Sequence, residues 1–132
     1  MNELNVEFHA EVPDDAVWND GGDLVVPPGK VIAEYVSNAL VAEGMRCTKV
    51  LQRDYYGWEF HIELAGADVI AVLQGLDERV IVLRCESSIL WPSDSKSRVS
   101  ALSATAESIK RALVADSRFT NVRILTEDES PS

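Results

Sequence analysis

The sequence predicts an α+β fold, in which two helices pack on one face of an antiparallel sheet of about five to six strands. Strand-like runs joined by short turns are grouped in the middle of the chain, and two amphipathic helical segments flank this group. A length of 132 residues is typical of one domain, so residues 1–132 are expected to fold as a single unit. The predicted order of elements is β-α-β-β-β-β-α-β.

The first strand is predicted at 4–11, where apolar and polar residues alternate strictly, as in a strand with one buried and one solvated face. Residues 13–23 are rich in Asp, Asn and Gly, which favour turns, so a loop is predicted there. A helix is predicted over 30–43, because apolar residues recur on one helical face and Gly44 is placed to end the helix.

Four strands are predicted next, at 45–53, 58–65, 69–74 and 79–85. The turns between them are short, which is typical of neighbouring antiparallel strands, so this region is expected to form a meander. A second helix is predicted over 96–116 from its apolar stripe at helical spacing. The closing strand is predicted at 121–126, and residues 127–132 are expected to be a frayed acidic tail.

Negative charge is concentrated near the N-terminus. The formal net charge is −10, and seven of the 22 acidic residues lie between Glu3 and Asp23, a stretch without Lys or Arg. A dense field of one sign attracts partners of the opposite sign and repels nucleic acid. We therefore expect a basic protein partner. Direct binding of nucleic acid is not expected, because the chain has no basic stripe with interleaved aromatic residues.

The expected partner-binding residues combine these acids with aromatic side chains in loops, since Trp and Tyr are the usual anchors of protein interfaces. The alternative is that the rings cover the ends of the sheet and that the acids form a solvated surface. Trp58 is expected in the core, because it shares a strand face with Phe60 and Ile62. The predicted partner-binding set is Asp14, Asp15, Trp18, Asp20, Asp23, Tyr55 and Tyr56.

Both histidines lie in strand segments with glutamates two residues away. Residues two apart on a strand share a face, so Glu7 and His9 project together, as do Glu59 and His61. If the two strands were neighbours, these side chains could hold a divalent metal such as zinc or manganese. The simpler interpretation is that they are polar residues on the solvated face of each strand. No metal or other cofactor is therefore predicted.

The sequence contains no catalytic signature. No serine has a nucleophile-elbow pattern, and no glycine motif for phosphate is present, so the chain is not expected to be an enzyme. Cys47 and Cys85 are expected to be buried reduced thiols, with a disulfide as the alternative. Residues 1–10 are not typical of a signal peptide, and no run approaches the ~20 apolar residues of a membrane span. A cytoplasmic protein without membrane contact is expected.

In size, acidity, order of elements and the aromatic residues in its acidic loops, the chain resembles the immunity proteins of bacterial toxin systems. The resemblance implies a non-catalytic protein that binds and blocks a cognate toxin, often a basic nuclease. The chain is also similar to homodimeric secretion chaperones in length and acidity, but its first and last strands depart from their pattern. Three functions stay open: an immunity-type protein, a secretion chaperone for an effector, and a small metal-dependent enzyme that uses the two histidine strands.

Overall fold

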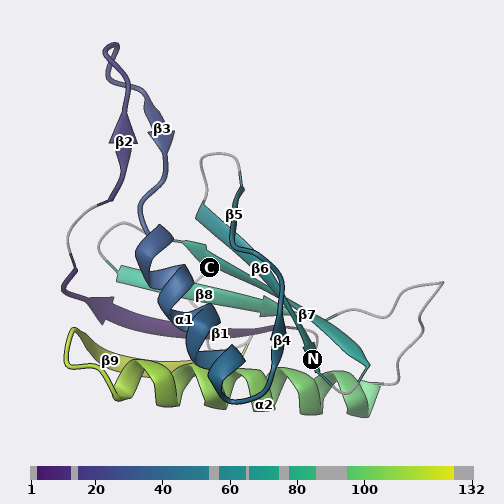
Figure 1. The fold of residues 1–132 in the computed structure, drawn as a ribbon. Coiled ribbons are helices and arrows are strands. Elements are labelled where there is room, and N and C mark those ends of the chain that lie inside the picture. Colours follow the sequence, from purple (N-terminus) through teal and green to yellow (C-terminus); the bar gives the residue numbers. More distant parts are fainter. Residues whose placement is uncertain are drawn as a thin grey trace.

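The computed structural model describes residues 3–12, 15–53, 57–64, 66–74, 78–85 and 95–126. In these residues one antiparallel sheet carries two helices on one of its faces, which confirms the predicted α+β class (Figure 1). The elements are, in chain order, β1 (Glu3–Ala10), β2 (Val17–Trp18), β3 (Leu24–Val26), α1 (Lys30–Ala42), β4 (Arg46–Cys47), β5 (Leu51–Arg53), β6 (Gly57–Leu64), β7 (Ala67–Gln74), β8 (Glu78–Arg84), α2 (Ser95–Val114) and β9 (Phe119–Thr126).

The strands of the main sheet follow the order β4-β6-β7-β8-β1-β9, and β5 also pairs with β6. β4 and β5 therefore share one edge position, and the single strand predicted at 45–53 is interrupted. The interruption has a local cause at Thr48, whose Oγ1 accepts the backbone N–H of His61 at 2.8 Å in place of a backbone carbonyl. The predicted meander is confirmed, because β6, β7 and β8 pair in succession.

The core lies between the helices and one face of the sheet. Alternate residues of β1 are buried, as its period of two predicts, and α1 and α2 bury their apolar stripes against the same cluster. Each fully buried Leu, Ile or Phe contributes about 1.5–3 kcal/mol. The Tyr35 hydroxyl, which donates to the Ala112 carbonyl at 2.7 Å, joins the two helices directly. Both predicted helices are confirmed, with bounds that differ by two residues or fewer.

The predicted element order is wrong in the region before α1. Part of the predicted loop at 13–23 belongs to a separate two-stranded ribbon, in which β2 pairs with β3 (Figure 1). The predicted closing strand is confirmed as β9, which begins two residues earlier because Phe119 is buried there in an edge-to-face contact with Phe8, with the ring centroids 5.7 Å apart. In the described part of the chain, no helix has the length and apolar character needed to cross a membrane. The predicted tail at 127–132 lies outside the described residues.

Candidate functional site

The most distinctive surface feature is an arm, residues 17–26, that projects beyond the N-terminal end of α1 (Figure 1). Its strands pair with each other and with no other described strand. Asn19 closes its turn: the Asn19 N–H donates to the Asp23 carbonyl at 2.9 Å, and Asn19 Oδ1 accepts the Asp23 N–H at 2.9 Å. Gly22 supplies the left-handed conformation, with φ of 85°, that the turn requires. The turn is therefore fixed by its own sequence.

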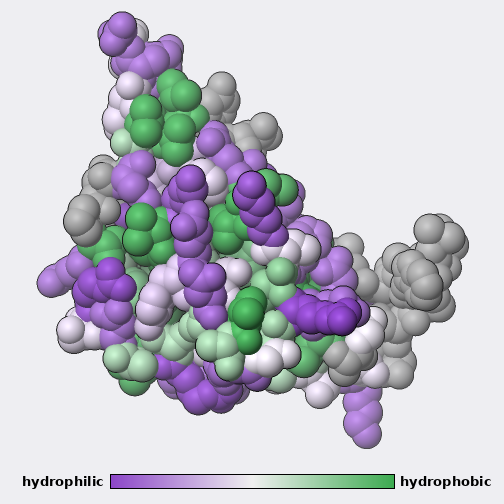
Figure 2. Space-filling view, viewed as in Figure 1, coloured by the Kyte–Doolittle hydropathy of each residue, from purple (hydrophilic) through white to green (hydrophobic). Residues whose placement is uncertain are grey.

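The arm exposes large apolar side chains. The exposed fractions are 50% for Val17, 56% for Trp18 and 42% for Val25. Asp20 and Asp23 are exposed in the turn, and Figure 2 shows the arm as a hydrophobic surface below a hydrophilic tip. The arm therefore combines exposed aromatic and apolar side chains with acids, in contrast to the buried apolar residues of the core.

The carboxylate of Asp15 fixes the root of the arm to α1. Asp15 Oδ1 accepts the Gly29 N–H at 2.7 Å, and Asp15 Oδ2 accepts the Val31 N–H at 3.0 Å. Gly29 is the N-terminal cap residue of α1 and has no side chain, so Asp15 supplies the cap from 14 positions earlier in the chain. Gly29 has φ of 112°, and a Cβ there would lie 2.9 Å from Leu73 Cδ2, so only glycine fits this close approach.

Two further hydrogen bonds hold the other strand of the arm to the sheet. The Trp58 indole N–H donates to the Pro27 carbonyl at 3.0 Å in a buried position. The Gln52 side-chain amide donates to the Val25 carbonyl at 3.0 Å. Trp58 is 6% exposed and belongs to the core, as predicted. With Asp15 on one strand and these two bonds on the other, the arm is held in a defined orientation.

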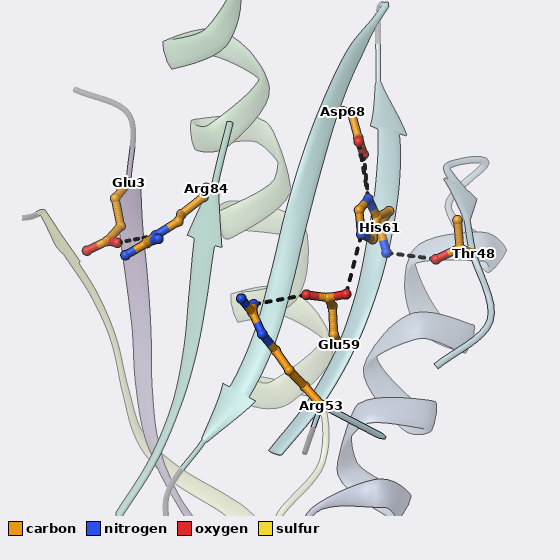
Figure 3. Close-up of polar contacts among 7 residues, drawn as sticks. All are labelled: Glu3, Thr48, Arg53, Glu59, His61, Asp68 and Arg84. Atoms are coloured by element: carbon orange, nitrogen blue, oxygen red, sulfur yellow. Dashed lines mark hydrogen bonds and ion pairs between the residues drawn. The ribbon is translucent and has the colours of Figure 1, made fainter. Parts of the chain in front are cut away.

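The acids that are close together in the sequence do not form one surface. Glu3 Oε1 accepts Arg84 Nε–H at 2.8 Å on the uncovered face of the sheet (Figure 3). Glu7 Oε1 accepts an N–H of Arg123 at 2.9 Å on the same face. Pairing of β1 with β8 and β9 brings these arginines to the glutamates, although each lies 80 or more residues away in the chain. Two of the seven N-terminal acids, Glu3 and Glu7, are thus opposed by bases from distant strands.

The predicted partner-binding residues fall into three groups. Trp18, Asp20 and Asp23 lie together on the arm. Asp15 lies at the root, where its carboxylate caps α1. Asp14, Tyr55 and Tyr56 lie outside the described residues.

The two histidine strands are not neighbours. β7 and β8 separate β1 from β6, which puts β1 and β6 about 14 Å apart at ~4.8 Å per strand. His61 lies opposite Ile70 on β7, which lies opposite Arg84 on β8, which in turn lies opposite Glu3 on β1. His9 is six residues from Glu3 along β1, so it is also displaced from His61 in the strand direction. Glu7 and His9 therefore cannot share a metal with Glu59 and His61. Within the described ranges, no group of three or more His, Cys, Asp or Glu is placed to hold a metal ion.

His61 instead belongs to a network of polar side chains at the edge of the uncovered sheet face (Figure 3). His61 Nδ1 lies 3.1 Å from Asp68 Oδ2, and His61 Nε2 lies 3.6 Å from Glu59 Oε2. Glu59 Oε1 also accepts an N–H of Arg53 at 2.9 Å. These contacts join β5 and β7 to β6 across a solvated surface, where each ion pair contributes ~0–1 kcal/mol.

A groove of about 560 Å³ runs between α1 and the edge strand formed by β4 and β5, and we call it the edge groove. The sequence does not predict this groove, because the outward-facing residues of α1 are mostly polar and the sequence predicts one continuous edge strand. Six of the seven exposed large apolar side chains in the described chain lie on the arm, α1 or β5. The residues that line the edge groove include Lys30, Glu34, Asn38, Val41, Lys49, Val50, Leu51 and Trp58.

The two cysteines are free thiols. Cys85 is buried and Cys47 is half-buried. Burial raises the pKa of both thiols, and for Cys47 a hydrogen bond with Ser37 opposes part of this rise. Neutral thiols are poor nucleophiles, so neither side chain is poised for covalent chemistry.

Comparison of the sequence with models of known protein families and with curated proteins gave no match.

Proposed function

We propose that this chain is a non-catalytic protein-binding domain of the immunity type, which docks a basic toxin through its arm. The observation that carries the proposal is Trp18, which is 56% exposed on a ribbon whose root is tied to the body by Asp15, Trp58 and Gln52. An isolated two-stranded ribbon is marginally stable in water. These ties therefore favour an ordered arm that presents an aromatic anchor to a partner.

Covering Trp18 supplies a substantial part of the binding free energy. A tryptophan buries about 150–250 Å² when fully covered, so a side chain that is 56% exposed offers roughly 100 Å² to a partner. At ~25 cal/mol per Å², its burial contributes about 2.5 kcal/mol, which corresponds to roughly 50- to 100-fold in the dissociation constant. Val25 is also exposed on the arm, and Val17, next to Trp18 on β2, points to the opposite face of the ribbon, so both faces of the arm are available to a partner.

Charge on the arm and on the whole chain favours a basic partner. Asp20 and Asp23 are exposed in the turn, and the chain carries a net charge of −10. Such a field accelerates association with a positive surface and weakens as salt is added. We expect Asp20→Asn with Asp23→Asn to slow association at low salt. These positions isolate the electrostatic effect, whereas a change at Asp15 would also remove the cap of α1.

The mechanism is occlusion, which needs no catalytic group. An arm seated in the active-site cleft of a toxin, with the acids of the turn near bases that would otherwise hold substrate phosphates, excludes the substrate. The described histidines and thiols have no role in this mechanism.

The test is a tagged capture from the native host at low and at raised salt, with captured proteins identified by mass spectrometry. The wild type should enrich one basic protein that is released as salt rises, and Trp18→Ala should lose it. That protein should arrest growth when expressed alone, and co-expression of the wild type should restore growth. Val114→Ala is the control, because Val114 is 62% exposed at the end of α2, away from the arm. Capture that is unchanged by Trp18→Ala would refute the proposal, and capture of a secreted effector would favour the chaperone function.

A further inference from the structure

We infer that the arm also docks into the edge groove of a second copy of this chain, which gives a two-fold dimer with reciprocal arms. The inference rests on the proposed role of the arm as a docking element. It adds a form of regulation, because self-docking covers Trp18 until a basic partner competes for the arm.

The charges of the arm and the edge groove are complementary. The arm carries Asp20 and Asp23, whereas the groove is lined by Lys30 and Lys49. Lys30 forms an ion pair with Glu34 at 3.9 Å, and Glu34 also lines the groove, whereas Lys49 forms no ion pair within the described part of the chain. Lys49 is therefore an accessible base in a chain of net charge −10, and the acidic turn complements it.

The apolar surfaces and the lengths also match. Val41 and Val50 line the groove, as does part of Trp58, and the arm offers Trp18. The groove follows α1 over 30–41, which is about 17 Å at ~1.5 Å per residue. Each leg of the arm has about five residues, which is also about 17 Å at ~3.3 Å per residue. One arm can therefore fill one groove along its whole length.

The arrangement of the arm relative to the groove favours exchange between two copies. The root of the arm lies at the end of the groove where α1 begins, and the arm extends away from its own body (Figure 1). An arm held in this way cannot fold into its own groove. A rotation of 180° about an axis near the arm places the arm of each copy over the groove of the other copy. The resulting contact is closed and isologous, because both copies use the same surfaces. The contact also covers the exposed edge of β5, a common means of protecting a sheet edge.

The first test is sedimentation equilibrium of the purified full-length chain over a range of concentrations and salt. We expect a monomer–dimer equilibrium that shifts toward monomer as salt rises. Trp18→Ala and Lys49→Glu should each raise the dissociation constant by about 10-fold or more, and Val114→Ala should leave it unchanged. Adding Asp20→Lys to Lys49→Glu should recover part of the lost affinity, because one acid of the arm and one base of the groove are then exchanged.

The second test is complementation. Trp18→Ala has an intact groove and Lys49→Glu an intact arm, so a mixed dimer has one intact contact and one contact in which both residues are replaced. Because both residues act on the same contact, replacing the second costs less than replacing the first, and an equal mixture should dimerise more tightly than either variant alone. Circular dichroism and urea unfolding establish that both variants are folded. A wild type that is monomeric at every concentration, or a dimer indifferent to both variants, would overturn the inference. Either result leaves the host capture by the arm intact as a separate test of the proposed function.

Discussion

The role of Asp15 gives the sharpest prediction about the folded state. Asp15→Ala removes two acceptors, one for the Gly29 N–H and one for the Val31 N–H, from the first turn of α1. The cap residue is glycine, so no local side chain can replace them. Loss of an N-cap costs about 0.5–2 kcal/mol, and the two charge-assisted bonds at 2.7 and 3.0 Å place Asp15 in the upper half of this range.

The expected decrease in the free energy of unfolding is therefore about 1–2 kcal/mol. For 132 residues at ~2.1 cal/mol/K per residue, the unfolding entropy is roughly 0.28 kcal/mol/K, so Tm should fall by about 4–7 °C. Asp15→Asn keeps one acceptor oxygen, and its decrease should be about half as large.

The assay is thermal and urea unfolding followed by tryptophan fluorescence. Asp20→Ala is the matched control, because it removes the same charge five positions later on the exposed turn, and its effect should stay within about 0.5 kcal/mol. Equal Tm values for Asp15→Ala and Asp20→Ala would refute the assignment of Asp15 as the cap of α1.

Other predictions concern the core and the thiols. Tyr35→Phe should lower the free energy of unfolding by about 1 kcal/mol in urea titrations, because the hydroxyl no longer donates to Ala112; no change would mean that solvent replaces this bond at no cost. Gly29→Ala should cost about 1–3 kcal/mol from its positive φ and its close contact, whereas an unaffected Tm would contradict the described backbone. Burial raises the pKa of Cys47 and Cys85 above the ordinary 9.0, so unfolded thiols ionise first. The contribution of the two thiols to the free energy of unfolding is therefore fully present below pH ~9, and it is lost as pH rises through the folded pKa values. The loss should be smaller in the Cys47→Ala, Cys85→Ala double variant, and an equal slope would exclude this cause.

Periodicity predicts the long elements of this chain well, because each buries one face against a common core. The alternation at 4–11 and the helical stripes of α1 and α2 arise because the apolar residues of each element face the core. These patterns therefore predict both the type of element and its buried face. The same argument predicts that Trp58 lies in the core, where it is 6% exposed.

The arm was missed because its strands are two and three residues long and bury little, so its sequence reads as a loop. The fate of the N-terminal acids was missed for a different reason. Glu3 and Glu7 are engaged by arginines 81 and 116 positions away, which strand order brings to them, and Asp15 is engaged by the start of α1, 14 and 16 positions away. Charge density along a sequence therefore overstates charge density on the surface when strands pair over long distances.

The separation of His9 from His61 has the same origin. Their segments look alike, but β7 and β8 lie between β1 and β6, because β1 pairs with β8, the last strand of the meander, and not with β6. Nothing in the two segments themselves specifies that order.

The most direct test of the arm as a docking element uses two valines with similar exposure. Val17 on the arm is 50% exposed and Val114 on α2 is 62% exposed. The affinity of the purified captured protein for Val17→Asp and Val114→Asp should be measured by titration calorimetry against the wild type. Docking by the arm predicts a loss of about 10-fold or more for Val17→Asp and wild-type affinity for Val114→Asp. Equal affinities for the two variants would contradict the proposal that this chain binds its partner through the arm.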